Sequence, residues 1–443
     1  MNTIRKRDGR EVIFDESKIT EAIFKAAQAV GGADKQIAIE LTLDVLRYLK
    51  QKYGDTPFSV EDVQDTVEKI LIEKGHAKTA KAYILYRAER TRMREAKSDL
   101  MDAVAEILVE TNRENANVSN SPSAKMLQIA SAASKAYYLT RMIPEKMAQA
   151  HTRGDYHIHD LDFYGKTLTC LQIPLGRLLS QGFNNGHGFI RPPKRPASAT
   201  ALAAIILQSS QNDMHGGQSF GFFDSDMAPY MQNASDDEVY QAMEALIYNL
   251  NSMHSRAGAQ VPFSSLNLGT DTSPAGRSVI KNILLAYEKG LGHGENPIFP
   301  NIIFRVKEGI NLNPGEPNYD LFKLAIRVAA QRLNPTFAFM DSSFNAPFGE
   351  QVGYMGCRTR VIANRRGPAV TDSRGNLSFT TINLPRLAIK ADRNLMKFYQ
   401  YLTDMIDLTC EQLYHRYQVQ AKLKVRDMPF LMGQGLYLDS EKL

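Results

Sequence analysis

The cysteines of this 443-residue chain are its residues with the clearest potential for chemistry. Cys170, Cys357 and Cys410 lie too far apart in sequence for a dense disulfide framework or a CxxC zinc clip. Cys357 stands between a glycine, which can present a thiol at a loop tip, and an arginine, which favours the thiolate. Cys410 lies in a helical pattern that predicts a buried structural thiol. Taken alone, Cys170 and Cys357 also fit inert thiols, and only their surroundings favour catalysis.

Two further groups of polar residues could line a binding site. His157 and His159 are two residues apart, so a strand would direct both side chains to one face. They lack an HExxH spacing and an evident third ligand, so we expect site-lining or core hydrogen-bonding groups and no metal on this chain. In the segment 261–267, three residues could bind a substrate phosphate or sugar, or form a polar turn between strands. They are Ser264, Ser265 and Asn267.

Positive charge gathers near the N-terminus. The strand-like runs TIRKR and REVIF are joined by Asp8-Gly9, a pair typical of a type I′ hairpin turn. Asp15 is placed to cap the helix that follows, with Lys18 in its first turn, where free N–H groups favour anions. The cluster could hold a triphosphate, or it could be a solvated basic hairpin. Its cations are Arg5, Lys6, Arg7, Arg10 and Lys18.

Two kinds of segment must position these groups. Apolar residues at helical spacing predict helices after Asp15, over 35–52, from a cap at Ser59 with Asp62 three residues on, and from 77 into the 90s. From residue 99 helical stretches alternate with short β-rich runs such as TLTCLQIPL and NPIFPNIIFRV, which predicts an α/β domain. The Gly-, Asn- and Pro-rich segment from 182 to 197 predicts a surface loop.

The overall composition is that of a globular protein, with 43% hydrophobic and 23% charged residues. A net charge of +5 is small for this length and makes no case for nucleic acid as a partner. The charged N-terminus lacks the apolar stretch of a signal peptide, and the apolar runs are too short to cross a bilayer. We therefore expect a cytoplasmic protein that does not enter a membrane.

Residue order adds a resemblance to these patterns. The string from Ile4 to Asp15, Lys18-Ile19 and the later Ala82-Tyr83-Ile84-Leu85-Tyr86-Arg87 resemble the ATP-cone, a mostly helical regulatory module with an N-terminal β-hairpin, over residues 1–95. The resemblance implies that ATP or dATP binds there as an allosteric effector. The implied nucleotide-binding residues are Arg5, Lys6, Arg7, Asp8, Gly9, Lys18, Tyr86 and Arg87.

Residues 96–443 resemble the class III anaerobic ribonucleotide reductases. The matching strings, in order, are Asn115-Ala116-Asn117-Val118, His157-Ile158-His159-Asp160, Thr169-Cys170, Gly356-Cys357-Arg358 and Ile382-Asn383-Leu384-Pro385-Arg386. The resemblance implies an incomplete ten-stranded α/β barrel that reduces ribonucleoside triphosphates to deoxyribonucleotides by thiyl-radical chemistry.

The same resemblance implies a role for each candidate residue. Cys357 would carry the thiyl radical that abstracts the 3′ hydrogen, and Cys170 would give a hydrogen to the 2′ position from the other side of the ribose. Asn383 would orient substrate or formate, which makes formate the expected reductant and a thioredoxin-like protein the alternative. Met355 would assist the reduction, although a packing residue at a loop base needs no chemistry.

Complete members of that family continue to a four-cysteine zinc site and a C-terminal glycine that stores the radical, and neither occurs in this sequence. We therefore expect the chain to be inactive alone and zinc to belong to the missing segment. The implied partners are a radical-SAM activating enzyme, a second copy in a homodimer and, in a split enzyme, a second chain with the glycine. Truncation, a split enzyme and a non-catalytic regulatory or assembly subunit stay open. A glycyl-radical lyase is disfavoured, because Cys357 lacks an adjacent second cysteine.

Overall fold

The computed structural model describes residues 3–6, 10–54, 56–109, 121–165, 167–256, 260–349, 352–356, 359–360, 362–365 and 367–438. Two compact units divide the chain, Met1–Met101 and Asp102–Leu443. The expected boundary between residues 95 and 96 lies slightly before this division, within helix α4 (Ala77–Val109). In the described part of the chain, no helix combines the length and apolar character needed to cross a membrane.

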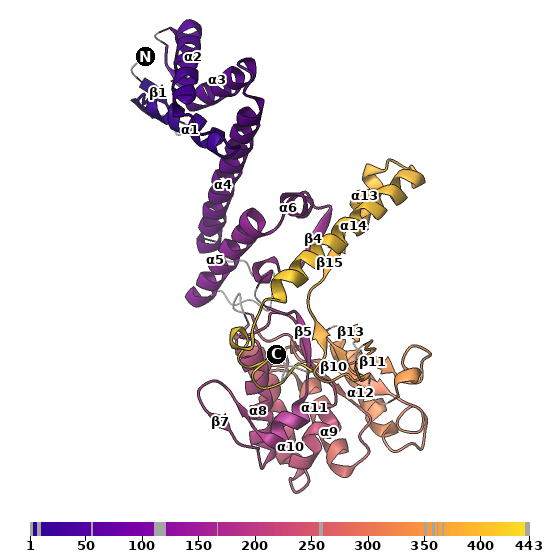
Figure 1. Ribbon diagram of the computed structural model, residues 1–443. Helices are drawn as coiled ribbons and strands as arrows, with labels where there is room; N and C mark the ends of the chain where they lie inside the picture. The colour runs from indigo at the N-terminus through magenta and orange to yellow at the C-terminus, as the bar shows by residue number, and fades with distance from the viewer. Residues whose placement is uncertain are drawn as a thin grey trace. The chain divides into compact units, whose positions relative to one another are not determined.

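The first unit is a small three-stranded sheet with helices (Figure 1). Its remaining elements are β1 (Thr3–Arg5), β2 (Glu11–Ile13), α1 (Ser17–Gln28), α2 (Lys35–Tyr53), β3 (Phe58–Ser59) and α3 (Val60–Glu73). Antiparallel pairing of β1 with β2 confirms the predicted hairpin, while Arg7, Asp8 and Gly9 lie outside the described residues. The helices bury their apolar faces in one core, as their spacing predicted.

Two helix starts test the predicted caps. Ser59 accepts a hydrogen bond from the Asp62 N–H at 3.1 Å, and the Asp62 carboxylate accepts one from the Ser59 N–H at 2.8 Å, which confirms the capping pair. Glu16, directly before α1, already has helical dihedral angles (φ −63°, ψ −28°) and makes no side-chain cap bond. The Asp15 carboxylate accepts the N–H of Ser17 at 3.1 Å, two residues on, so Asp15 caps the start of this helix as predicted.

The second unit is the larger α/β part. Its α-helices are α5 (Pro122–Tyr137), α6 (Glu145–Thr152), α7 (Leu175–Gln181), α8 (Pro196–Ser210), α9 (Phe223–Met227), α10 (Asp236–Ser252), α11 (Pro274–Lys289), α12 (Tyr319–Arg332), α13 (Leu384–Lys390) and α14 (Leu395–Gln420). Its strands are β4 (Tyr156–Ile158), β5 (Cys170–Ile173), β6 (Phe183–Asn184), β7 (Phe189–Ile190), β8 (Gln218–Phe220), β9 (Ser264–Leu268), β10 (Asn301–Val306), β11 (Thr336–Phe339), β12 (Tyr354–Met355), β13 (Thr359–Arg360), β14 (Gly375–Asn376) and β15 (Thr380–Ile382).

A six-stranded sheet forms the centre of this unit, in the order β11-β10-β9-β8-β5-β14. The strands β5, β8, β9, β10 and β11 are parallel, and β14 pairs antiparallel with β5. Helices α8, α10, α11 and α12 pack side by side along it (Figure 1). This arrangement confirms the α/β class, while the count of ten barrel strands stays a prediction.

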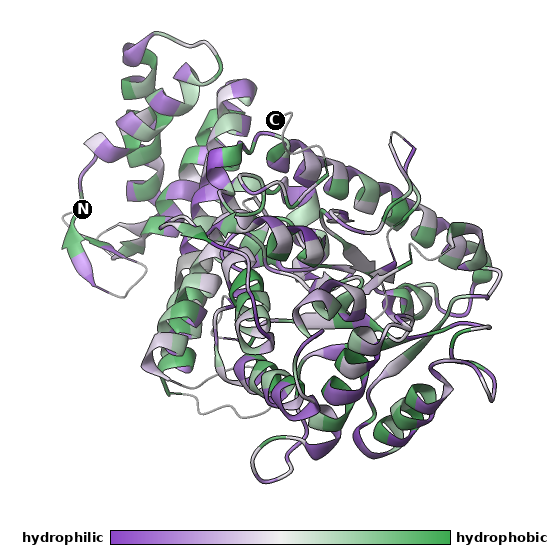
Figure 2. Cartoon of the chain, turned by 90° about the horizontal axis from the view of Figure 1, so that it is seen from below, coloured by the Kyte–Doolittle hydropathy of each residue, from purple (hydrophilic) through white to green (hydrophobic). Residues whose placement is uncertain are grey.

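Side chains alternate between the two faces of the parallel strands. One face joins the hydrophobic core under the helices, with Leu171, Ile173, Phe220, Leu266 and Leu268. The other face, called the inner face here, carries Cys170, Gln172, Ser219, Ser265 and Asn267. Hydrophobic and hydrophilic residues also alternate around the helices (Figure 2). A strand period of two therefore separates the packing residues from the polar ones.

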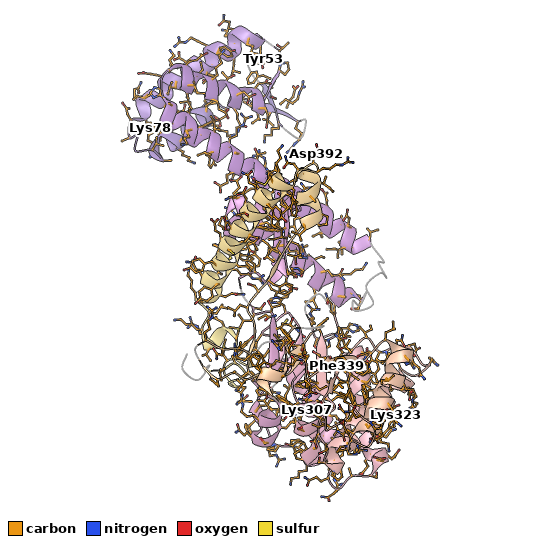
Figure 3. All side chains as sticks on the ribbon, turned by 90° about the vertical axis from the view of Figure 1, so that its right-hand side faces the viewer. Tyr53, Lys78, Lys307, Lys323, Phe339 and Asp392 are labelled. Atoms are coloured by element: carbon orange, nitrogen blue, oxygen red, sulfur yellow. The ribbon has the colours of Figure 1, made fainter. Side chains whose placement is uncertain are left out.

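A two-stranded sheet of β4 and β15 lies with α13 and α14, whose connecting turn is marked by Asp392 in Figure 3. Arg416 of α14 is buried and donates to the carbonyls of His159 at 2.9 Å and Tyr164 at 3.1 Å. Cys410 is exposed on the same helix, so its predicted burial was wrong. The reason is geometric, because Cys410 is two residues from Leu408 and from Gln412, and these two mark the buried side of α14.

Buried charge is concentrated where the parallel strands end. Asp224, in α9 after β8, forms an ion pair of 3.0 Å with Arg305 at the end of β10, and both side chains are almost fully buried. The second carboxylate oxygen of Asp224 accepts the N–H groups of residues 269, 270 and 271, which follow β9. One carboxylate thus ties together the ends of three neighbouring strands.

Two more carboxyl groups at this end of the sheet have few partners. Asp372 lies close to Gly221, which directly follows β8. A Cβ added to Gly221 would be 3.1 Å from Asp372 Oδ1. Asp226 Oδ2 and Asp372 Oδ1 are enclosed and accept no hydrogen bond from the described residues. Burial raises the pKa of Asp226 to about 7, and the charge of Asp372 adds to this. Burial also raises the pKa of Asp372 to about 7, against the effect of Arg305 and Arg177.

These raised pKa values predict that the free energy of unfolding falls as the pH rises from about 4 to about 8. The unfolded carboxyl groups lose their protons early in this range, whereas the folded groups keep theirs to about pH 7. Asp372→Asn should therefore raise the free energy of unfolding by roughly 2–4 kcal/mol at pH 8 and change it little at pH 4. Urea titrations at both pH values measure this difference. The control is Asp404→Asn on the exposed side of α14, and an equal effect of Asp372→Asn at both pH values would refute the assignment.

Candidate functional site

The described residues 352–356 and 359–360, which include the antiparallel pair of β12 and β13, lie against the inner face of the sheet and are called the finger loop here. Its first strand, β12, contacts β5, β8 and β9 and pairs with β13. Asn267 holds this strand with both ends of its amide, since Oδ1 accepts the Tyr354 N–H at 2.7 Å and Nδ2 donates to the Tyr354 carbonyl at 2.7 Å. Ser219 donates to the same carbonyl, also at 2.7 Å, and Ser265 accepts the Gly356 N–H at 3.0 Å. The inner face therefore fixes the loop through its backbone.

These contacts give a structural role to residues expected to bind substrate. Ser264, Ser265 and Asn267 are fully buried in the central strand β9, so the alternative of a polar turn was wrong. The side chains of Ser265 and Asn267 hold the finger loop. The Ser264 hydroxyl is buried without a hydrogen-bond partner among the described residues. Substrate binding by these three residues stays a prediction.

The direction of the finger loop follows from two close approaches of glycines. A Cβ on Gly353 would lie 3.2 Å from the Cα of Gly221, which follows β8. A Cβ on Gly217, which precedes β8, would lie 3.3 Å from the Cα of Gly356. The loop therefore enters at the carboxyl end of the parallel strands and places Gly356 at their amino end. Gly356 has φ = 60°, a left-handed conformation that suits glycine.

Cys170 lies at this amino end, as the first residue of β5, and is half-buried. Its sulfur accepts the N–H of Gly217 at 3.3 Å, and a Cβ on Gly216 would lie 2.9 Å from it. Gly217 thus binds the Cys170 sulfur and leaves no room for a side chain between itself and Gly356, the residue before Cys357. Cys357 itself and Arg358 lie outside the described residues. Met355 is fully buried in β12, and its predicted catalytic role stays untested.

An open cleft of about 510 Å³ is lined by residues of β4 and of segments that follow it or face it. The ring of His157 lies 5.3 Å from that of His151 and 4.8 Å from that of His159. The side chains of His157 and His159 are therefore neighbours, as expected for residues two apart on a strand. His159 shares a hydrogen bond of 2.7 Å with the Thr381 hydroxyl. Burial lowers the pKa of His151 and of His159, and His157 adds to both shifts. Among the polar residues lining the cleft are Lys135, His151, His157, Asp160, Asp162, Arg256 and Gln260.

His215 connects this cleft to the turn beside Cys170. Its buried ring stacks on Phe163, shares a hydrogen bond with Thr167 and approaches Asp160 to 3.4 Å. Burial lowers the pKa of His215, although Asp160 opposes this shift. Burial acts to raise the pKa of Asp160, but the nearby ring of His215 and the charges of Arg256 and Arg416 leave it lowered. The pair therefore favours neutral histidine beside an ionised carboxylate.

Asn383 lies in a different setting from Cys170. It caps α13, where Oδ1 accepts the Arg386 N–H at 3.1 Å, and its Nδ2 donates to the Gly154 carbonyl at 2.9 Å. It follows β15, which belongs to the two-stranded sheet with β4 rather than to the six-stranded sheet. Both ends of its amide have structural bonds, and its predicted role toward substrate or formate remains to be tested.

In the first unit, a cavity of about 220 Å³ lies between α1 and α4. Lys18, Lys25 and Tyr86 line it, so the structure brings two of the expected nucleotide residues together. Arg87 is directed elsewhere, because it pairs with Asp65 and Glu68 of α3. Arg5 forms a 3.8 Å pair with Glu11 on the hairpin, and Lys6 is exposed there.

Comparison with known proteins places these features in a family. The sequence profile described as anaerobic ribonucleoside-triphosphate reductase matches residues 114–443, and that of the ATP cone domain matches residues 2–92. The anaerobic ribonucleoside-triphosphate reductases of Salmonella typhimurium and Escherichia coli are each 30% identical over 472 residues, which cover 98% of this chain. The chain spans 65% of the length of either relative.

The fold has solved counterparts as well. The anaerobic ribonucleotide reductase from Thermotoga maritima in complex with dATP and CTP superimposes with a TM-score of 0.57 at 15% identity, covering 79% of this chain and 66% of that one. At this identity the match shows a shared fold. Because the reductase profile covers most of the sequence, the chain belongs to the anaerobic ribonucleoside-triphosphate reductase family.

Proposed function

We propose that this chain is the large component of an anaerobic reductase that converts ribonucleoside triphosphates to deoxyribonucleotides. Cys357 would carry the thiyl radical and Cys170 would supply the second reacting sulfur. The observation that supports this most directly is the position of Gly217, which donates its N–H to the Cys170 sulfur and whose added Cβ would lie 3.3 Å from the Cα of Gly356, the residue before Cys357. A sulfur radical needs its target near van der Waals contact, and two thiols on either side of one sugar require such a junction.

The cleft beside β4 is the proposed entrance for the nucleotide. Its volume of about 510 Å³ falls within the range of small-molecule sites. His157 and Arg256 offer hydrogen-bond donors for the sugar or phosphate groups, and Arg256 also binds the turn that holds Cys170. This position links substrate binding to the reacting sulfur.

Replacing Cys357 by Ala should reduce turnover at least a thousandfold in the complete enzyme, with the glycyl-radical segment and its activase supplied. Cys170→Ala should have an effect of the same order, because each sulfur is proposed to react with the sugar. Cys410→Ala is the matched control and should keep turnover, since this thiol is exposed on α14. The assay measures deoxyribonucleotide formed under anaerobic conditions. Turnover by Cys357→Ala would favour the second candidate, a non-catalytic nucleotide-binding or assembly subunit.

The first unit would regulate this reaction by binding ATP or dATP. Lys18 and Tyr86 line one cavity, which combines a cation for phosphate with an aromatic face for a base. Arg5 and Lys6 on the adjoining hairpin would add positive charge. Arg7, Asp8 and Gly9 of the proposed set lie outside the described residues.

Lys18→Ala should weaken dATP binding by about ten- to a hundredfold, because one charge-assisted phosphate contact contributes roughly 1.5–3 kcal/mol. Isothermal titration calorimetry of the whole chain measures the affinity. Lys78→Ala removes a lysine from α4 outside the cavity and should leave the affinity unchanged (Figure 3). Unchanged binding by Lys18→Ala would show that the nucleotide site lies elsewhere.

The proposed reaction also requires groups outside the described residues. A glycyl radical would generate the thiyl radical, and a radical-SAM activating enzyme would form it. Formate is the proposed reductant, with a thioredoxin-like protein as the alternative. The proposed working form is a cytoplasmic homodimer, joined by a second chain with the radical glycine if the enzyme is split, and zinc would belong to that radical segment.

A further inference from the structure

Arg256 lies between the cleft and the turn beside Cys170. Its Nε donates to the His215 carbonyl at 2.8 Å, and its Nη1 donates to Gln260 Oε1 at 2.6 Å. The side chain also lines the cleft together with His157 and Asp160. Two hydrogen bonds of good length fix the guanidinium, so its charge has a defined position.

The turn that Arg256 holds is the turn that contacts the Cys170 sulfur. His215 supplies the carbonyl for Arg256, and Gly217, two residues on, donates its N–H to the sulfur at 3.3 Å. Gly216 lies between them and approaches the same sulfur so closely that an added Cβ would be 2.9 Å away. The guanidinium and the Cys170 sulfur therefore bind the same three-residue turn.

The surrounding charges leave Arg256 as a cation near this sulfur. Burial lowers the pKa of Arg256, and the charges of Asp160, Cys170 and Asp162 act against that shift. His215 favours the neutral form because burial lowers its pKa. The hydroxyl of half-buried Tyr437 is enclosed, and burial raises its pKa, so it stays protonated. The carboxylates of Asp160 and Asp162 partly offset the field of Arg256.

We propose that Arg256 is a positioning residue that stabilises Cys170 as a thiolate. In the proposed reaction, the Cys170 thiol gives its proton to the 2′-hydroxyl. The C2′–O bond breaks with its electron pair on oxygen, water leaves, the 3′ sugar radical becomes a radical cation, and the negative charge stays on sulfur. A fixed guanidinium lowers the cost of that charge. The meaning for turnover rests on the proposed function, whereas the thiolate can be measured without it.

The test is the alkylation of Cys170 by iodoacetamide in the whole chain, measured by mass spectrometry of its peptide from pH 6 to pH 10. Arg256→Gln should slow the reaction of Cys170 at pH 7 by about five- to tenfold and move the pH profile upward, because a thiolate shift of one pKa unit changes the reactive fraction tenfold. Arg256→Lys should restore more than half of the rate. Arg191→Gln, in the exposed segment after β7, is the matched control, and Cys410 serves as an internal reference.

A Cys170 rate within twofold of the parent protein would overturn the proposal. A loss that Lys does not restore, or that Cys410 shares, would also overturn it, because either pattern reports altered packing rather than charge. These outcomes are independent of the proposed function. The two tests can also disagree. If Cys357→Ala abolishes turnover while Arg256→Gln leaves the pH profile of Cys170 alkylation unchanged, the proposed reductase function stands and the proposed role of Arg256 is wrong.

Discussion

Hydrogen bonds between the inner face of the sheet and the backbone of the finger loop are the constraint on which this structure depends. The N–H and carbonyl of Tyr354 are strong polar groups that need partners once they are buried. Asn267 supplies an acceptor and a donor to these two groups from one amide. With Ser265 on Gly356, it fixes how far the loop extends along the strands. The site beside Cys170 follows from that depth.

Much of the fold was predictable because it depends on local patterns. Helix spacing, the Ser59 capping pair and the hairpin of β1 and β2 each involve neighbours in sequence. The alternation of packing and polar residues in β9 is also a local pattern, but the groups that the polar side chains contact come from a distant part of the chain. The polar residues of β9 fitted either substrate binding or a turn, whereas Ser265 and Asn267 hold the finger loop, which comes about 90 residues later in the chain. Exposure of Cys410 likewise depends on which side of α14 meets the rest of the unit.

Within the candidate site, only residues that belong to recognisable sequence motifs could be predicted. Cys170, His157 and His159 stood in recognisable strings, and the structure places them at the amino end of β5 and along β4. His215 and Arg256 had no such signal, because their importance comes from a turn and a cleft assembled from distant segments. A buried ion pair such as Asp224 with Arg305 is equally invisible in sequence, since its partners belong to separate strand ends.

Formation of a disulfide between Cys170 and Cys357 tests the central claim most directly, because a disulfide requires Cα atoms within about 7 Å. Mild oxidation of the folded chain, followed by mass spectrometry of linked peptides, compares the three possible pairings of its cysteines. The account predicts that the 170–357 link predominates in the folded chain and loses this preference in denaturant. Links distributed evenly among the three pairs, or no 170–357 link at all, would contradict it.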